Sequence, residues 1–217
     1  WGARMGSSGT DLGTSVVSDQ TLNVYVTGNY TGIMNVFNSS NVFSTNLAPY
    51  GGQDMFVVKY GPSGQALWGA RMGSSGTEYS NSACLGTTGN VYIAGSYNGV
   101  MNVYNSSNVY VSNLALVSTT QSGFLAQYDI NGNVVRTNRS GSTAPTTNSI
   151  VINAIALNKS NIYMTGYTQG LISLYTSGNV ISNIQNTTTQ DVFVAKYTQT
   201  GNAVWLTTMS STGADAG

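Results

Sequence analysis

The sequence predicts an all-β protein made of small antiparallel sheets repeated in tandem. Three observations support this prediction. Residues 1–10 occur again, unchanged, as residues 68–77. Valine, isoleucine, tyrosine, phenylalanine and threonine cluster in short runs between glycine, asparagine and serine, which is typical of strands joined by turns. No stretch sustains the 3.6-residue period of an amphipathic helix.

The repeat divides the chain into copies at about 1–67, 68–135 and 136–204, followed by the start of a fourth at 205–217. The third copy opens on the diverged segment RTNRSGS, and the fourth opens on WLTTMSSTGAD. Both ends of the chain fall inside a copy. We therefore expect this segment of about three blades, plus the start of a fourth, to belong to a longer chain.

Each copy contains three hairpins, seen most clearly in the second. The first joins residues 82–85 to 91–93 through TTGN, and its return strand ends at Gly95. The second, residues 101–114, folds back on itself around NSSN and is called the middle hairpin below. The third joins residues 124–129 to 134–135 through Asn131-Gly132, where a four-residue turn needs the positive φ that glycine adopts without steric cost.

The apolar runs are too wide for strands with one wet face. Residues 55–58, 91–93 and 192–195 are apolar at successive positions, so both faces of these strands are expected to be covered. In a repeat array the covering layers are the neighbouring copies. The middle hairpin alternates apolar and polar residues and is expected at an edge. Because small sheets twist with a right hand, face-to-face stacking of such sheets favours a radial arrangement of blades, a β-propeller, over an open solenoid.

A series of motifs resembles the SBBP β-propeller repeat of bacterial surface proteins and some large-virus proteins. The motifs are D-x-F-x-x-K-Y at 54–60, G-x-x-x-W at 64–68 and G-N-V-Y-x-x-G at 89–95, separated by a Gly-Ser-rich turn. The resemblance covers essentially the whole chain and implies a propeller of several blades without general catalytic residues. The second copy departs from the pattern at Ser122, Gln127 and Arg136.

Composition excludes several classes of function. Charged residues are 6% of the chain and the net charge is zero, which argues against the basic face that a nucleic-acid binder needs. No apolar run approaches the ~18 residues of a membrane helix, so membrane insertion is not expected. With no histidine and one cysteine, Ser-His-Asp, Cys-His, zinc and haem sites cannot form within this segment. We expect no enzyme activity, no cofactor and no metal.

Acidic residues recur at turns. Asp11, Glu78 and Asp215 fall at one position of the repeat, where the third copy has Ser149. We expect these acids, and Asp54 before its strand, to accept backbone N–H bonds in tight turns. The recurrent tryptophans at 1, 68 and 205 leave two alternatives, packing between blades or platforms for sugars.

The aromatic residues around the middle hairpin are the candidate contact surface. The segment alternates, so one face is expected to remain exposed to a partner subunit or a glycan. The candidates are Tyr30, Phe37, Phe43, Tyr97, Tyr104 and Tyr110. Asn38 and Asn105 are candidate glycosylation sites, because each begins an N-x-S sequence in an NSSN turn at an expected exposed tip.

The sequence therefore predicts a non-enzymatic scaffold, exposed on a cell or virion surface, whose blades present loops and hairpins to partner subunits. Expected partners are other blades of the same polypeptide or further protein subunits, and glycans in the alternative reading of a carbohydrate-binding propeller. A third alternative is an enzyme whose catalytic residues lie in blades outside this segment.

Overall fold

The computed structural model describes residues 1–141, 149–176, 179–184 and 189–209. All regular structure in these ranges is β-strand, and no helix in them could span a membrane. The strands are β1 (Met5–Gly6), β2 (Asp11–Ser18), β3 (Val24–Tyr30), β4 (Met34–Phe37), β5 (Phe43–Leu47), β6 (Asp54–Tyr60), β7 (Ala66–Gly73), β8 (Glu78–Leu85), β9 (Val91–Tyr97), β10 (Met101–Tyr104), β11 (Tyr110–Leu114), β12 (Ser122–Tyr128), β13 (Val134–Gly141), β14 (Ser149–Asn158), β15 (Asn161–Gln169), β16 (Ile172–Thr176), β17 (Asn179–Ile184), β18 (Gln190–Thr198) and β19 (Ala203–Met209).

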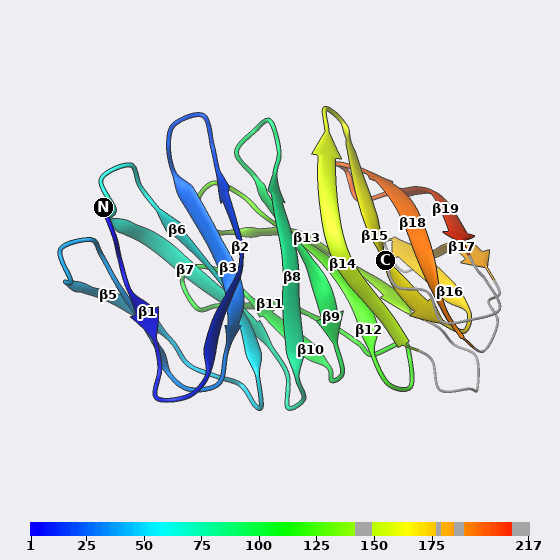
Figure 1. The fold of residues 1–217 in the computed structure, drawn as a ribbon, viewed down its shortest axis with the longest axis horizontal. Helices are drawn as coiled ribbons and strands as arrows, with labels where there is room; N and C mark the ends of the chain where they lie inside the picture. Colours follow the sequence, from blue (N-terminus) through cyan, green and yellow to red (C-terminus); the bar gives the residue numbers. More distant parts are fainter. Residues whose placement is uncertain (142–148, 177–178, 185–188, 210–217) are drawn as a thin grey trace.

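Three antiparallel four-stranded blades follow one another along the molecule (Figure 1). The first blade has the strand order β2-β3-β6-β7, the second β8-β9-β12-β13 and the third β14-β15-β18-β19. Each turn glycine predicted at the β6–β7, β12–β13 and β18–β19 connections has a positive φ, of 79°, 81° and 82°. The predicted all-β, β-propeller-like class is confirmed.

The middle hairpins lie at sheet edges, as predicted, but each extends the blade before its own. Hairpin β10–β11 of the second copy pairs with β7 of the first blade, with Asn102 opposite Gly73 and Val103 opposite Met72. Hairpin β16–β17 pairs with β13 in the same way, and β4–β5 pairs with the short β1. The hairpin therefore joins two successive blades, since it lies between β9 and β12 of the second blade in sequence but pairs with β7 of the first.

Blades and sequence copies are out of phase. The residues that open the second copy lie in β7, the last strand of the first blade. Residues 205–209, expected to start a fourth blade, lie in β19 and complete the third, while residues 210–217 are outside the described ranges. The described segment thus contains three complete four-stranded blades, preceded by a remnant strand, β1.

Three apolar clusters fill the spaces between successive sheets. In β6, β9 and β12 every side chain is buried, because a sheet covers each face, as their apolar runs predicted. Strand β18 differs, since buried and half-buried residues alternate along it. One face of residues 192–195 is half-exposed because within the described chain no following sheet covers the third blade, so cover of both faces stays a prediction at this strand.

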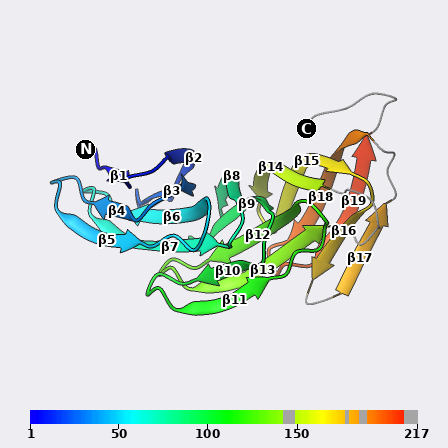
Figure 2. The ribbon, with the colours of Figure 1, turned by 90° about the horizontal axis from the view of Figure 1, so that it is seen from below.

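The first strands of successive blades lie side by side and are joined by hydrogen bonds (Figure 1). The amide of Ala83 donates to Ser15 Oγ, and the amide of Ile155 donates to Ser82 Oγ, each over 3.2 Å. At the opposite edge, the last strands of the first and second blades, β7 and β13, are each extended by a hairpin. The blades therefore approach one another at their first strands, while hairpins fill the space between their outer edges. Figure 2 shows the successive sheets edge-on.

Candidate interaction surface

The terminal strands of the two N-terminal sheets, β5 and β11, expose apolar side chains. Tyr110 is 50% exposed and its counterpart Phe43 is 52% exposed. Val109 and Val111 beside Tyr110, and Val42 beside Phe43, are also exposed. We call these five residues the outer stripe. The stripe is the part of the predicted contact surface that the structure leaves accessible.

Tyr30 and Tyr97 cannot belong to that surface, because both side chains are fully buried. Their hydroxyls donate to the carbonyls of Ala48 and Ala115, over 3.1 and 3.0 Å. Their rings meet phenylalanine rings of the adjacent strand edge-on. They were predicted to be exposed because they precede the hairpin in sequence, but they end strands β3 and β9, which are covered on both faces at that point.

Phe37 and Tyr104 are half-buried and hold the hairpins to the preceding strand. The guanidinium of Arg71, on β7, lies 3.8 Å from the centre of the Tyr104 ring, and its Nε donates to Asn108 Oδ1 over 2.9 Å. Arg4 makes the same two contacts, 3.6 Å above the Phe37 ring and with Asn41. These rings hold each hairpin to the strand that it extends, so only one face of each aromatic pair remains for a partner.

Replacing Arg71 with methionine is expected to destabilise the chain by about 1–2 kcal/mol, because it removes a cation–π contact and a hydrogen bond. Chemical denaturation measures the loss. The matched test is a double-mutant cycle with Tyr104→Leu, in which the Arg71 substitution should cost less than it does in the wild type. Strictly additive effects would show that the two side chains do not interact.

The candidate glycosylation sites lie in turns that are held by hydrogen bonds within the turn and to a neighbouring turn. Asn38 and Asn105 are half-buried, and the Oδ1 of each accepts two backbone N–H bonds within its turn. Ser106, the residue after Asn105, donates its amide to the Gly132 carbonyl over 2.9 Å. The tips are thus less free than expected, and glycosylation at these positions stays a prediction.

Two side chains of the first blade fasten the β12–β13 turn of the second. Lys59 Nζ and Trp68 Nε1 both donate to the Ile130 carbonyl over 3.0 Å. Lys59 stands between Tyr25 and Trp68 in the sheet register, and burial lowers its pKa. The Trp68 ring stacks on Tyr128 at 6.4 Å. Trp68 is therefore a packing residue. At this position the structure favours packing between blades over a platform for sugars.

The other tryptophans differ in exposure but follow the same pattern. Trp1 Nε1 donates to the Pro62 carbonyl over 2.9 Å, although 61% of the side chain is exposed. Trp205 lies beside Tyr163 and is 39% exposed on the third blade. In the second blade the equivalent pair is Gln127 and Arg136, joined by a bond of 2.7 Å from Arg136 Nε. Arg136 is half-buried and bonded to Gln127. Each blade therefore has one cationic side chain at this position of its sheet.

The recurrent acids hold turns, as predicted for Asp11, Glu78 and Asp54. Asp11 accepts from the amide and hydroxyl of Ser7 over 2.7 and 2.8 Å. Glu78 accepts from the amide of Ser74 over 2.8 Å and from its hydroxyl. Asp54 accepts from the amide of Tyr50.

The expected place of Ser149 is wrong by one residue. Glu78 N donates to Gln53 O, and in the next blade Ile150 N donates to Gln121 O. Ile150, not Ser149, therefore stands where the second blade has Glu78. A β-bulge occurs at the same position in both strands, so the offset comes from the alignment of the diverged third copy.

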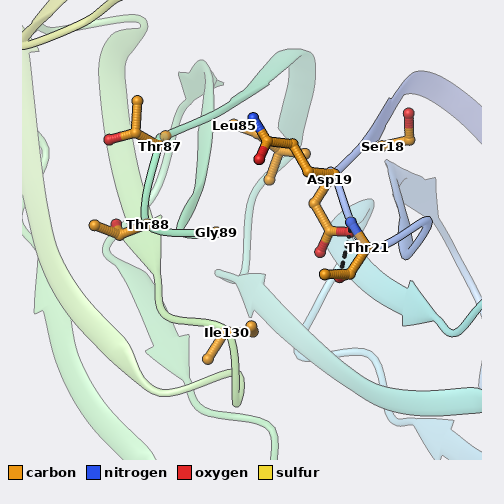
Figure 3. A pocket seen from close by; sticks show the side chains of 10 residues that line it. Ser18, Asp19, Thr21, Leu85, Thr87, Thr88, Gly89 and Ile130 are labelled. Atoms are coloured by element: carbon orange, nitrogen blue, oxygen red, sulfur yellow. Dashed lines mark hydrogen bonds between the residues drawn. The ribbon is translucent and has the colours of Figure 1, made fainter.

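A cavity of 410 Å³ opens between the turns of the first two blades. Asp19 and Thr21 of the β2–β3 turn lie on one side, and Thr87 and Thr88 of the β8–β9 turn lie on the other (Figure 3). The Asp19 carboxylate accepts four bonds from residues of its own turn. The lining thus combines hydroxyl groups and turn backbone with the apolar side chains of Leu85 and Ile130.

The described residues contain no cluster of three or more His, Cys, Asp or Glu that could hold a metal ion. In the cavity the Thr21 hydroxyl donates to the Asp19 carboxylate over 2.8 Å, a contact within the turn.

Comparison with known proteins places the chain among repeat proteins. No family model matches it, so the resemblance to SBBP repeats is not supported at the level of that family. The chain is 28% identical over 241 aligned positions to an uncharacterized WD repeat-containing protein of Acanthamoeba polyphaga mimivirus. The alignment covers 98% of this chain but 17% of that relative. Together with the blade architecture, this similarity indicates a β-propeller-like repeat protein.

Proposed function

We propose that this chain is a non-enzymatic scaffold that binds partner protein subunits through the outer stripe. The observation that supports the proposal is the exposure of Tyr110 and Val111 on a terminal strand, directly after the exposed Val109. Strand β11 is the last strand of its sheet, so its outer backbone groups lack a strand partner within the described chain. A terminal strand with apolar side chains on both faces suits the addition of a strand from a partner.

The stripe is repeated on successive blades, which favours a protein partner over a small molecule. Val42 and Phe43 repeat the pair Val109 and Tyr110 at the same place on the preceding sheet. A partner that contacts both stretches at once binds more tightly than through one of them, although neither contact itself becomes stronger.

Further blades of the same polypeptide are a second kind of partner. The outer face of β18 is half-exposed, and β19 ends its sheet, whereas β7 and β13 are each paired with a hairpin. A following repeat would cover that face and supply the missing hairpin. The relative's greater length supports this proposal, since the chain spans 17% of it.

We propose that the scaffold lies on the exterior of a cell or virion. Its polarity comes from Ser, Thr, Asn and Gly and not from charge, and zero net charge favours assembly over free diffusion. The similar protein belongs to a large virus, which supports the virion setting. Antibody labelling of intact cells or particles should detect the chain without permeabilisation, and labelling that needs permeabilisation would contradict this placement.

Replacing Phe43 and Tyr110 together with serine is expected to weaken assembly at least tenfold, because each buried aromatic contributes ~1.5–3 kcal/mol. Cross-linking in the native assembly, followed by sedimentation, measures the loss. The thermal midpoint should stay unchanged, since both side chains are half-exposed in the isolated chain. Leu22→Ser, at an exposed turn away from the stripe, is the matched control. Equal assembly of the double variant and the control would overturn the proposal.

The alternative function, sugar binding, is favoured only by the hydroxyl-lined cavity of Figure 3. The stacked Trp68 does not offer a free platform, so a sugar would rely on hydroxyl and backbone contacts near Thr87 and Thr88. Screening the chain on a glycan array tests the sugar-binding alternative. Binding that is lost on Thr88→Val would favour the sugar site, whereas no binding to any glycan would discard it.

A further inference from the structure

Two buried carboxyl groups from different blades meet at the junction between the first and second blades. Asp54 begins β6 of the first blade and Glu78 begins β8 of the second. Their side chains are 1% and 0% exposed, and the two carboxyls are hydrogen-bonded to each other. Two ionised carboxylates in contact away from water would repel strongly, so the contact needs a positive charge or a proton.

The hydrogen bonds around the pair leave Asp54 Oδ1 in need of a donor. Both oxygens of Glu78 accept from Ser74, and the Asp54 carboxylate accepts from the amide of Tyr50 and is stabilised by the amide of Gly51. Asp54 Oδ1 itself is buried and has no hydrogen-bond partner. A protonated Glu78 carboxyl supplies that donor. The same proton removes the repulsion between the two groups.

A metal ion fits the surroundings poorly. Ca²⁺ requires about six to eight oxygen ligands, and here two carboxyls are already engaged with hydroxyl and amide groups. Backbone packing is also tight, since a Cβ at Gly73 would lie 2.1 Å from Asp54 Oδ1. The positive charge of Arg71 favours the ionised form of Asp54. The buried Tyr30 hydroxyl, on β3, also lies near Asp54.

We propose that Asp54 and Glu78 share one proton that holds the first two blades together, and that loss of this proton as the pH rises to neutrality loosens their junction. Burial raises the pKa of Glu78 to about 7 and raises the pKa of Asp54 as well, in agreement with this geometry. The inference concerns the stability of a junction and does not depend on the proposed partner binding.

The next junction lacks both acids at once. Ser122 stands at the position of Asp54, and Ile150 stands at the position of Glu78. Ser122 Oγ accepts the amides of Val117 and Ser118 over 3.0 Å each, so the turn is still held without charge. If the two acids share a proton, a junction should have both acids or neither. A single carboxylate at this junction would be buried without a partner. The second junction is expected to be insensitive to pH.

The direction of the pH effect follows from proton binding. Unfolded Glu78 releases its proton near its ordinary pKa of 4.5, whereas folded Glu78 holds it to about 7. The folded chain therefore binds more protons between these values, and stability falls as the pH rises through this window. Above it the loss is complete. Thermal unfolding of the wild type at pH 5.5 and pH 8 should differ by about 4 °C or more, with the lower midpoint at pH 8.

Glu78→Gln tests the proposal, because the amide donates to Asp54 at every pH. This variant should lose the pH dependence and exceed the wild type in midpoint at pH 8. Asp11→Asn is the matched control, since Asp11 holds the equivalent turn but is exposed, and it should keep the wild-type pH profile. Carboxyl carbon NMR should show Glu78 titrating near pH 7.

Two outcomes would overturn the proposal. One is a wild type whose midpoint varies with pH no more than that of Glu78→Gln. The other is recovery of the midpoint at pH 8 on addition of millimolar Ca²⁺, which would make the pair a cation site. The partner-binding proposal is tested at the outer stripe and survives either result.

Discussion

Replacing Leu125 with alanine is expected to lower the free energy of unfolding by about 3 kcal/mol, and replacing its neighbour Phe124 by about 4 kcal/mol. Adjacent residues of a strand point to opposite faces, so a strand with one wet face would show one large loss and one small one. In β12 both losses should be large, because Phe124 packs in the cluster between the first and second blades and Leu125 packs in the cluster toward the third. Chemical denaturation measures both.

Strand β18 provides the matched control within the same protein. Phe193 is fully buried, whereas Val194 is half-buried on the face that no described sheet covers. Phe193→Ala should therefore cost about 3–5 kcal/mol, and Val194→Ala about 1 kcal/mol or less. A small loss at Leu125, similar to that at Val194, would show that the second blade is not enclosed between two others in solution.

Gly95→Ala is expected to destabilise the chain by about 3 kcal/mol. A Cβ at this position would lie 1.8 Å from the backbone oxygen of Tyr79 and 3.0 Å from the Phe124 ring. Strand β8 has a bulge opposite Gly95, and the backbone cannot withdraw without breaking the pairing of β8 with β9. Gly28 and Gly166 face equivalent bulges and show the same close approach.

Gly13→Ala is the control for this prediction. Gly13 lies at the bulge of the first blade, but nothing is within 4 Å of its Cβ position. Its substitution should change stability by no more than about 0.5 kcal/mol. If both alanine variants proved equally stable, the bulge would be free to shift, and the recurrence of glycine at Gly95 would need another explanation.

Much of the fold was predictable because it depends on local patterns. The turn glycines Gly64, Gly132 and Gly201 were recognisable, since the positive φ each adopts is a property of a few neighbouring residues. The burial of β6 and β9 on both faces was visible in their unbroken apolar runs. The run of β18 is equally apolar, yet one of its faces is half-exposed, because cover of that face depends on whether another sheet follows.

The candidate site was predictable only in part. Phe43 and Tyr110 lie at the surface, as the alternation of the hairpin indicated, and Tyr30 and Tyr97 do not. Alternation shows which residues share a face of one strand, but not which sheet the strand joins. The contact of Arg71 with Tyr104 depends on the pairing of the hairpin with β7, and the meeting of Asp54 with Glu78 crosses from one blade to the next, so strand alternation could not have revealed either.

The amino-acid sequence by itself determined that this protein is a tandem array of antiparallel sheets with recurrent tight turns, because strand period and turn chemistry act over a few residues. Only the tertiary structure decided which blade each hairpin extends, which aromatic rings remain exposed, and which carboxyl groups share a buried junction. These features depend on contacts between residues about 20 to 70 positions apart in the chain, and such contacts are set by how whole sheets pack against one another.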